Sequence, residues 1–311
     1  MEQILLIKVI KKTTAHIRRW ILFTCLLSTN IYTFAAQQPV IISSATSHYQ
    51  QSLVQSILIH LKESEIQATT IDIDQQPVPD TSNELIISIG DKASMLVNQE
   101  NLSAPRLSVY TQIDPDKDQD QKNTIHLSMT QHACQQFELT RSLNSKWKNV
   151  SVLLSNQNTA LIKKLESCAA QYNLALRTIL LSQYVSIIDA LNTSLLNSDI
   201  LLALPDSDVY NARTIKGILL TTYRHKVPVI GFSESFVRAG ALAAIHTSTE
   251  QLGKQIADII IKHYNNGHIE TRHLFPAYFD ISINKDVAKS LGIITPDRKA
   301  LIEKMNHKNN E

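Results

Sequence analysis

The stretch from Ser198 to Gly240 constrains the fold of this chain most, because two short apolar runs in it flank an amphipathic segment. The runs cover residues 200–204 and 227–232, and polar residues follow each of them. Short unbroken apolar runs are typical of strands that are buried on both faces, as in a parallel sheet. Between the runs, apolar side chains recur at helical spacing, at Ile215, Ile218 and Leu219. The order strand, helix, strand predicts part of a doubly wound α/β sheet.

The same alternation of strands and helices extends along the chain. Strands are expected at residues 39–43, 69–73, 85–89, 106–110, 150–155 and 176–181. Helices are expected at residues 49–61, 92–98, 133–143, 159–172, 185–196 and 249–264, and Ser248 and Gln251 form a capping box for the last of these. The polar segment 115–123 reads as a surface loop or linker between two such units. Because the 275 residues that follow residue 36 exceed the usual size of one core, the pattern predicts two lobes.

Polar residues follow three strands of the second unit. They are Ser155, Asn156, Asp206, Ser207, Ser233, Glu234 and Ser235. Small ligands bind outside the carboxyl ends of parallel strands, so we expect these residues to line a ligand site. For an amino acid, Asp206 or Glu234 could hold the ammonium group. Two alternatives stay open: Asp206 caps the next helix, and Glu234 pairs with Arg238 four residues later.

The first unit has its own polar residues at strand ends. Ser43, Ser44 and Thr46 precede a helix, where hydroxyls and free amides either bind an anion or simply cap the helix. Tyr49 could stack on a ligand, and Gly90 would let the backbone turn sharply and approach one. The remaining candidates are Asp91, Tyr110 and Thr111.

Ordered motifs between about residues 149 and 293 resemble a known family. The matching strings cover residues 205–206, 210–213, 228–234, 237–243, 251–255, 279–284 and 288–292. They are similar to the solute-binding proteins of ABC importers, in the group that includes the tryptophan- and tyrosine-type binding proteins. The resemblance implies a type I periplasmic binding protein, with two doubly wound lobes, a central cleft and a hinge of three chain crossings. It places residues 37–125 and 247–272 in lobe 1, and residues 126–246 and 273–311 in lobe 2.

The same resemblance implies a function. The protein would be a monomer that captures a small polar solute, such as an amino acid, by hinge closure and delivers it to a membrane permease. The rival reading is a periplasmic sensor of the same fold, which would pass a ligand-dependent shape to a membrane signalling protein.

Several function classes are disfavoured by what the sequence lacks. Its seven glycines form neither G-x-G-x-x-G nor a P-loop, so no nucleotide cofactor is expected. No G-x-S-x-G string is present, and the histidines near the carboxyl end show no metal-ligand spacing, so neither an enzyme nor a metal site is expected.

The first 36 residues read as a secretory signal peptide. Five basic residues precede the apolar run 20–27, and Ala35 and Ala36 suit a cleavage site. A retained membrane anchor is the alternative. Cleavage would change the formal net charge from +2 to −2, because it removes five basic residues and one acidic residue. Such a chain has no electrostatic footprint for nucleic acid, and its expected location is the periplasm.

Two cysteines, Cys134 and Cys168, remain beyond that segment. In an oxidising compartment they could form one disulfide between two helices. Two separately buried thiols are the other possibility.

Overall fold

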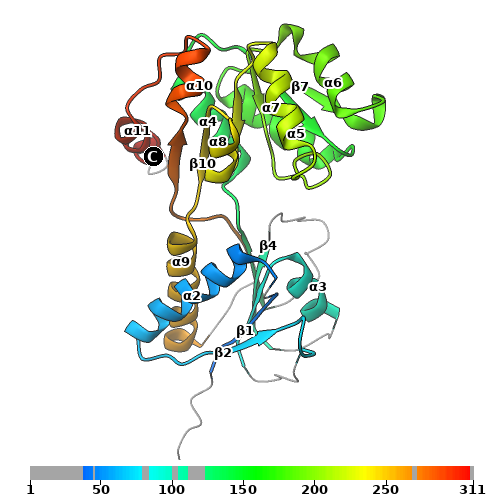
Figure 1. Cartoon of the computed structure of the whole chain (residues 1–311). Helices are drawn as coiled ribbons and strands as arrows, with labels where there is room; N and C mark the ends of the chain where they lie inside the picture. Colours follow the sequence, from blue (N-terminus) through cyan, green and yellow to red (C-terminus); the bar gives the residue numbers. More distant parts are fainter. Residues whose placement is uncertain are drawn as a thin grey trace, which may run out of the picture. The chain divides into compact units, whose positions relative to one another are not determined.

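The computed structural model describes residues 38–308, apart from residues 45, 79–83, 100–103, 111–122 and 268–271. Two six-stranded sheets form the two lobes, with strand orders β11-β5-β4-β3-β1-β2 and β12-β10-β9-β8-β6-β7 (Figure 1). The two-lobed, doubly wound α/β fold is therefore confirmed. The expected signal peptide and residues 115–122 of the expected linker lie outside the described residues.

The first sheet is parallel throughout, and its inner strands β1, β3 and β5 are buried on both faces. Its strands are β1 (Val40–Ser43), β2 (Thr69–Asp72), β3 (Ile86–Ile89), β4 (Arg106–Tyr110), β5 (Thr124–Ser128) and β11 (Arg272–Leu274). Ile41 packs into one core cluster, whereas Val40 and Ile42 pack into another on the opposite face. Alternate side chains of a strand point to opposite faces, which is why the run is apolar without interruption.

Three helices cover this sheet. On one face, α2 (His48–Glu63) and α9 (Thr249–Asn266) lie side by side and share a core (Figure 1). On the other face, α3 (Asp91–Gln99) contributes Ala93 and Val97 to the smaller core. The capping box at the start of α9 is confirmed, and Gly267 ends this helix in the left-handed conformation with φ 69°.

The second sheet is parallel except for its last strand, since β12 runs antiparallel to β10. Its strands are β6 (Asn149–Leu154), β7 (Ala175–Leu180), β8 (Ile200–Leu202), β9 (Val229–Gly231), β10 (Ala243–His246) and β12 (Asp280–Ile283). The helices of this lobe are α4 (Ala133–Leu143), α5 (Thr159–Gln171), α6 (Ile187–Ser194), α7 (Ile215–Arg224), α8 (Glu234–Ala239), α10 (Lys285–Ser290) and α11 (Arg298–Lys308). Two short 3-10 helices, η1 (Leu181–Gln183) and η2 (Leu195–Asn197), flank α6.

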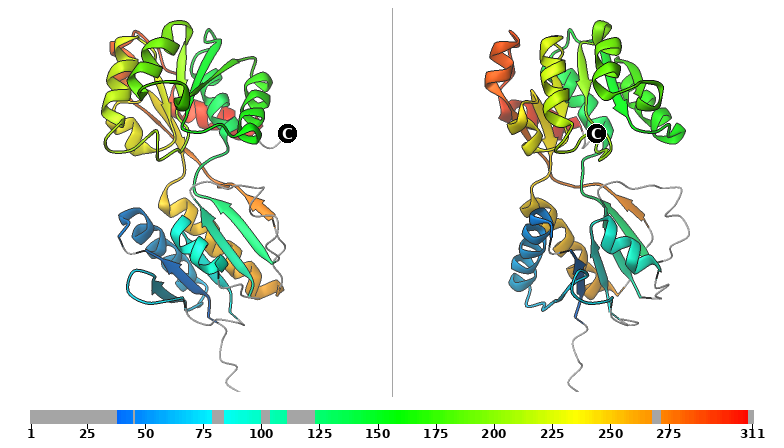
Figure 2. Two further views of the ribbon diagram at one scale, coloured as in Figure 1. Left: turned by 90° about the vertical axis from the view of Figure 1, so that its right-hand side faces the viewer. Right: turned by 45° about the vertical axis from the view of Figure 1, so that its right-hand side comes forward.

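Three segments connect the two sheets (Figure 2). They join β5 to α4, β10 to α9, and β11 to β12. The first sheet continues to Ser128 through β5 and includes β11 as far as Leu274, a few residues beyond the expected lobe boundaries.

Some elements were not anticipated from the sequence. β5 and β11 carry histidines, and β10 is rich in alanine, so their propensity for strands is weak. The expected polar loop at residues 233–235 is instead the start of helix α8, which Ser233 caps. With only six residues, α8 is too short to show a helical period in the sequence.

Candidate functional site

The loop after β1 forms a small hydrogen-bonded cluster in the first lobe. The hydroxyl of Ser44 lies 2.7 Å from that of Thr46 and donates to the carboxylate of Asp74. The backbone N–H of Ser44 donates to the side chain of Gln50 at 3.1 Å. The cap of α2 is Ser47, whose hydroxyl accepts from the N–H of Gln50. Ser44 therefore contacts Asp74 and Thr46, whereas Ser47 caps α2.

Asp74 is a member of this cluster that the sequence did not reveal. Its carboxylate also accepts a hydrogen bond from the Lys92 ammonium at 2.5 Å. The bonds from Lys92 and Ser44 hold the pKa of Asp74 below its ordinary value. The side chain of Lys92 is 59% exposed, so one charged donor of this lobe remains accessible to a ligand. Lys92 thus links the start of α3 to the segment after β2.

Gly90 brings the end of β3 next to this loop. Its φ of 91° is a conformation that other residues adopt with strain, and a Cβ here would lie 2.2 Å from the amide nitrogen of Gln50. Gly90 thus makes a close approach, as expected, but to Gln50. The neighbouring Asp91 begins α3 and is exposed.

Four further residues expected in the first lobe are less informative. Ser43 is the partly buried last residue of β1, and Tyr49 is 40% exposed in the first turn of α2. Tyr110 ends β4, but its side chain and Thr111 lie outside the described residues.

In the second lobe, Asp206 joins the ends of two strands. One carboxylate oxygen accepts from the N–H of Ser155 at 3.0 Å and from its hydroxyl at 2.8 Å. The other oxygen accepts from the N–H groups of Asp208 and Val209 at 3.1 and 3.3 Å. Both oxygens are therefore engaged within the protein, and Asp206 shapes the loop after β8.

Asn156 and Ser207, which directly follow Ser155 and Asp206 in the chain, also form hydrogen bonds within the protein. The side chain of Asn156 donates to the Ser155 hydroxyl at 3.3 Å. Ser207 is exposed, and its carbonyl accepts from the side chain of Asn211 at 2.9 Å.

The start of α8 holds the remaining expected residues of this lobe. The hydroxyl of Ser233 accepts from the N–H of Phe236 and lies 3.0 Å from the hydroxyl of Ser235. Glu234 forms an ion pair with Arg238 at 3.0 Å, one turn later. Two roles were considered for Glu234, ligand binding and pairing with Arg238, and the structure shows the pairing.

A cavity of about 870 Å³ adjoins Glu234 and Arg238. The cavity was not predicted from the sequence, because its walls come from α8, β10, β12 and the segment before α11, which are distant along the chain. Arg298 and Asp280 on its wall form a two-pronged ion pair. His246 shares a hydrogen bond with Ser282 at 2.9 Å, and burial lowers the pKa of this histidine despite the acidic groups nearby. The wall thus combines cationic, anionic and hydroxyl groups, which suits a polar solute.

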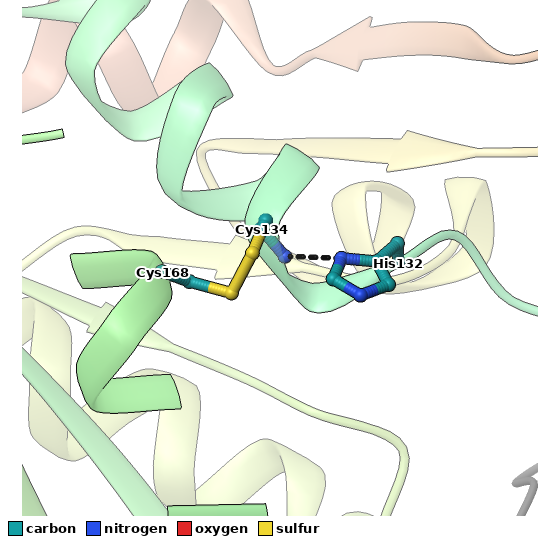
Figure 3. Close-up of side chains that lie close together, drawn as sticks. All are labelled: His132, Cys134 and Cys168. Carbon is teal, nitrogen blue, oxygen red and sulfur yellow. Dashed lines mark hydrogen bonds between the residues drawn. A yellow bond between two sulfur atoms is a disulfide. The ribbon is translucent and has the colours of Figure 1, made fainter. Parts of the chain in front are cut away.

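Cys134 and Cys168 form a disulfide that ties α4 to α5 (Figure 3). His132 caps α4, since its Nδ1 accepts from the N–H of Cys134 at 3.1 Å. These three residues are the one group of three potential metal ligands found within the described ranges. Both sulfur atoms are bonded to each other, so the group offers no metal site in this state.

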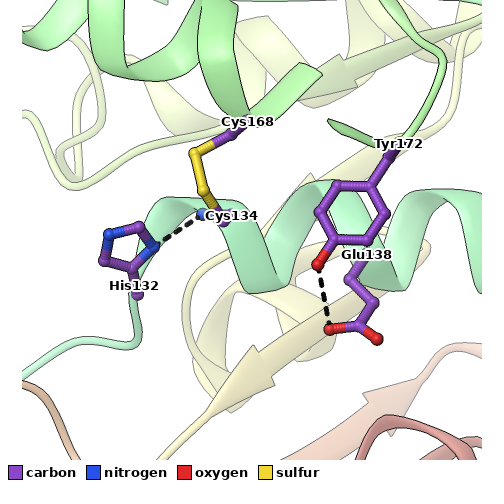
Figure 4. The surroundings of a disulfide bond; sticks show 5 residues. All are labelled: His132, Cys134, Glu138, Cys168 and Tyr172. Atoms are coloured by element: carbon purple, nitrogen blue, oxygen red, sulfur yellow. Dashed lines mark hydrogen bonds between the residues drawn. A yellow bond between two sulfur atoms is a disulfide. The ribbon is translucent and has the colours of Figure 1, made fainter. Parts of the chain in front are cut away.

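Glu138 and Tyr172 lie beside the disulfide (Figure 4), and both side chains are buried. The Tyr172 hydroxyl donates to Glu138 at 3.3 Å, and burial together with this carboxylate raises the pKa of Tyr172 to about 12. The pKa of His132 falls to about 4, because burial and the nearby Lys164 disfavour its charged form. The bridge and its neighbours therefore brace the inside of the second lobe.

Residues 55–306 match the family of ABC transporter substrate binding proteins. The chain belongs to this family, which is a class of solute-binding proteins and not a class of enzymes. Membership implies a small-molecule ligand and a membrane transporter as partner, and proteins of the family typically work outside the cytoplasmic membrane. No helix within the described ranges has both the length and the apolar character that crossing a membrane requires.

Solved structures with the same fold include three from bacteria. A conserved domain protein from Vibrio cholerae is 22% identical with a TM-score of 0.61, over 86% of this chain and 98% of that one. A Streptococcus domain in complex with L-Trp is 17% identical, also with a TM-score of 0.61 and the same coverage. A ligand-free, open substrate-binding protein with adhesive properties from Clostridium difficile is 17% identical, with a TM-score of 0.65 over 85% of this chain and 97% of that one. A search of curated protein sequences finds no match.

Proposed function

We propose that this protein is the periplasmic solute-binding component of an ABC import system. It would work as a monomer that captures a small polar solute between its two lobes and presents it to a membrane permease. The observation that carries this proposal is the family match over residues 55–306. Two mostly parallel sheets joined by three crossings support it, because such lobes can close around a ligand.

Amino acids are the first class of solute to test. The related Streptococcus domain was solved in complex with L-Trp. In this chain, Lys92 is a cation suited to a carboxylate, while Asp74 and Glu234 are carboxylates suited to an ammonium group. A zwitterion would therefore find partners of both signs.

A thermal-shift screen of the exported protein tests the proposal. The panel contains amino acids including L-tryptophan, and sugars, nucleobases and oxyanions serve as comparison classes. A ligand at about 100 times its dissociation constant adds roughly 2.7 kcal/mol to stability, which gives a clear rise in Tm. If no class raises the Tm, solute capture by this protein is contradicted.

Calorimetric titration with the best amino acid then tests the second-lobe residues. An acidic partner of the ammonium group is worth at least roughly tenfold in affinity, about 1.4 kcal/mol. Asp206→Ala and Glu234→Ala are the test variants, and Lys262→Ala on the exposed side of α9 is the control. If both acidic variants bind like the parent protein, the ammonium partner lies elsewhere, and Asp74 is the next candidate.

The export step has a separate test. If residues 1–36 are a cleaved signal, intact-mass analysis of the periplasmic fraction finds a chain that starts near Ala36 or Gln37. A full-length chain held in the membrane would instead indicate an anchor.

A sensor of the same fold remains the second candidate. Genes for a permease and an ATPase beside this gene favour transport, whereas a lone receptor or sensor kinase gene favours signalling.

A further inference from the structure

The three segments between the lobes share one hydrogen-bonded junction. The side-chain nitrogen of Gln131 donates to the Thr247 hydroxyl at 2.5 Å and to the Tyr278 carbonyl at 2.7 Å. The Thr247 hydroxyl in turn donates to the same carbonyl at 2.9 Å. Gln131 and Thr247 are only 6% and 8% exposed. Each of the three residues comes from a different crossing, so this junction couples all three.

Along the first crossing, the residues on either side of Gln131 are held by different lobes. Ser128, the last residue of β5, accepts from the N–H of Thr130 at 3.1 Å and donates to its carbonyl at 2.9 Å. On the other side, His132 is fixed as the cap of α4. Gln131 is the residue between these two anchors.

The second crossing has the same arrangement around Thr247. His246 belongs to β10 and pairs with Asp280 of β12, so it belongs to the second sheet. Ser248 caps α9 in the first lobe and completes the capping box with Gln251. Again a single residue lies between the anchors.

The third crossing is held by α9 up to Ala277. The Gln255 side chain donates to the Phe275 carbonyl at 3.2 Å and accepts from the N–H of Ala277 at 2.8 Å. Beyond Tyr278, Phe279 packs against the core of the second lobe, and Asp280 is paired with Arg298. Tyr278 therefore corresponds to Gln131 and Thr247 in the other crossings.

We infer that Gln131, Thr247 and Tyr278 are the pivot of the hinge, and that the Gln131 side chain positions the lobes for ligand capture. Bending concentrates at these residues because their neighbours are fixed to one lobe or the other. The Gln131 amide makes the three pivots move together and limits the range of lobe orientations in the ligand-free protein. This inference rests on the proposed function for its biological meaning, but its test does not need a ligand.

The test measures distances between two spin labels by pulsed electron paramagnetic resonance in the ligand-free full chain. The labels are placed on Lys62→Cys in α2 and Lys216→Cys in α7, two exposed positions, in a Cys25→Ser background. Gln131→Met keeps the length of the side chain but removes both donated hydrogen bonds. The share of distances outside the main peak of the parent protein then rises roughly tenfold, which corresponds to about 1.4 kcal/mol.

Two further variants make the result decisive. Thr247→Val removes the hydroxyl at nearly constant size and has the same effect as Gln131→Met. Gln171→Met, at the exposed end of α5, leaves the distance distribution unchanged. Circular dichroism shows that each variant is folded. If the distributions of the folded Gln131 and Thr247 variants equal that of the parent, the pivot assignment is wrong. Broadened distributions in these variants, combined with a thermal-shift screen in which no solute raises the Tm, would uphold the pivot while contradicting the proposed function.

Discussion

The polar residues at the strand ends of the two lobes differ in how fully their hydrogen-bonding groups are paired within the protein. In the second lobe, Asp206 accepts four hydrogen bonds from its own loops, and Glu234 is paired with Arg238. In the first lobe, Asp74 and Lys92 form an ion pair whose cation is largely exposed. The difference teaches that a carboxylate at a strand end can be wholly engaged as a structural acceptor, as Asp206 is, whereas the ion pair of the first lobe keeps its cation accessible.

The largest expected effect concerns the disulfide of the second lobe, which has no counterpart in residues 38–128 of the first. The disulfide closes a separation of 34 residues within the second lobe, and residues 38–128 contain no cysteine. Replacing both Cys134 and Cys168 by serine lowers the free energy of unfolding by about 3–4 kcal/mol, because the unfolded chain regains the entropy that the closed loop removes. Denaturant unfolding measures this loss.

Hydrogen exchange assigns the disulfide effect to a lobe. Protection in the second sheet falls in the double serine variant, whereas protection of β1 and β3 is kept. Equal loss of protection in both sheets would show that the lobes unfold as one unit.

The second effect tests whether Asp206 is mainly structural. Asp206→Ala removes the acceptor for Ser155, Asp208 and Val209, so we expect the free energy of unfolding to fall by about 2–3 kcal/mol. Asp206→Asn is the matched control, because it keeps one acceptor oxygen and loses less. A stable Asp206→Ala variant that fails only in ligand binding would reverse the comparison between the lobes.

The third effect is the pH dependence contributed by the first lobe. The pKa of Asp74 is lowered in the folded state, so its stabilising contribution is present above its ordinary value of 3.8 and is lost as the pH falls through the folded-state pKa. In Asp74→Asn, the Tm therefore changes less than in the parent protein when the pH is lowered from about 6 to about 3. Identical Tm profiles for the two proteins would mean that the pair with Lys92 does not persist in solution.

The smallest effect is expected at Glu234. Its pair with Arg238 is exposed and one helical turn apart, so Glu234→Gln changes the free energy of unfolding by less than about 0.5 kcal/mol. The same denaturant unfolding experiment serves here. A loss as large as that of Asp206→Ala would place Glu234 among the structural acceptors.

The sequence predicted the regular elements best where their pattern was long or apolar. The runs at residues 85–89 and 200–204 contain β3 and β8, and helix 133–143 has the bounds of α4. The pattern failed for β5, β10 and β11, which are only three to five residues long and carry histidines or alanines. These strands exist because neighbouring strands supply hydrogen bonds and burial, which no local window contains.

The candidate site was predicted in outline only. Strand ends bore the expected polar residues, but Asp74 was missed although a strand was predicted at residues 69–73, because its partners Ser44 and Lys92 lie 30 and 18 residues away along the chain. The partners of Asp206 and Lys92 lie 51 and 18 residues away along the chain, and spacing alone did not point to them.

The sequence by itself determined the alternation of strands and helices, the caps of α9 and the family resemblance, because each depends on neighbouring residues. Only the tertiary structure decided which acidic groups are occupied and how Gln131, Thr247 and Tyr278 meet between the sheets. The physical reason is that a side-chain hydrogen bond acts over about 3 Å, whereas the residues that share it can be far apart along the chain.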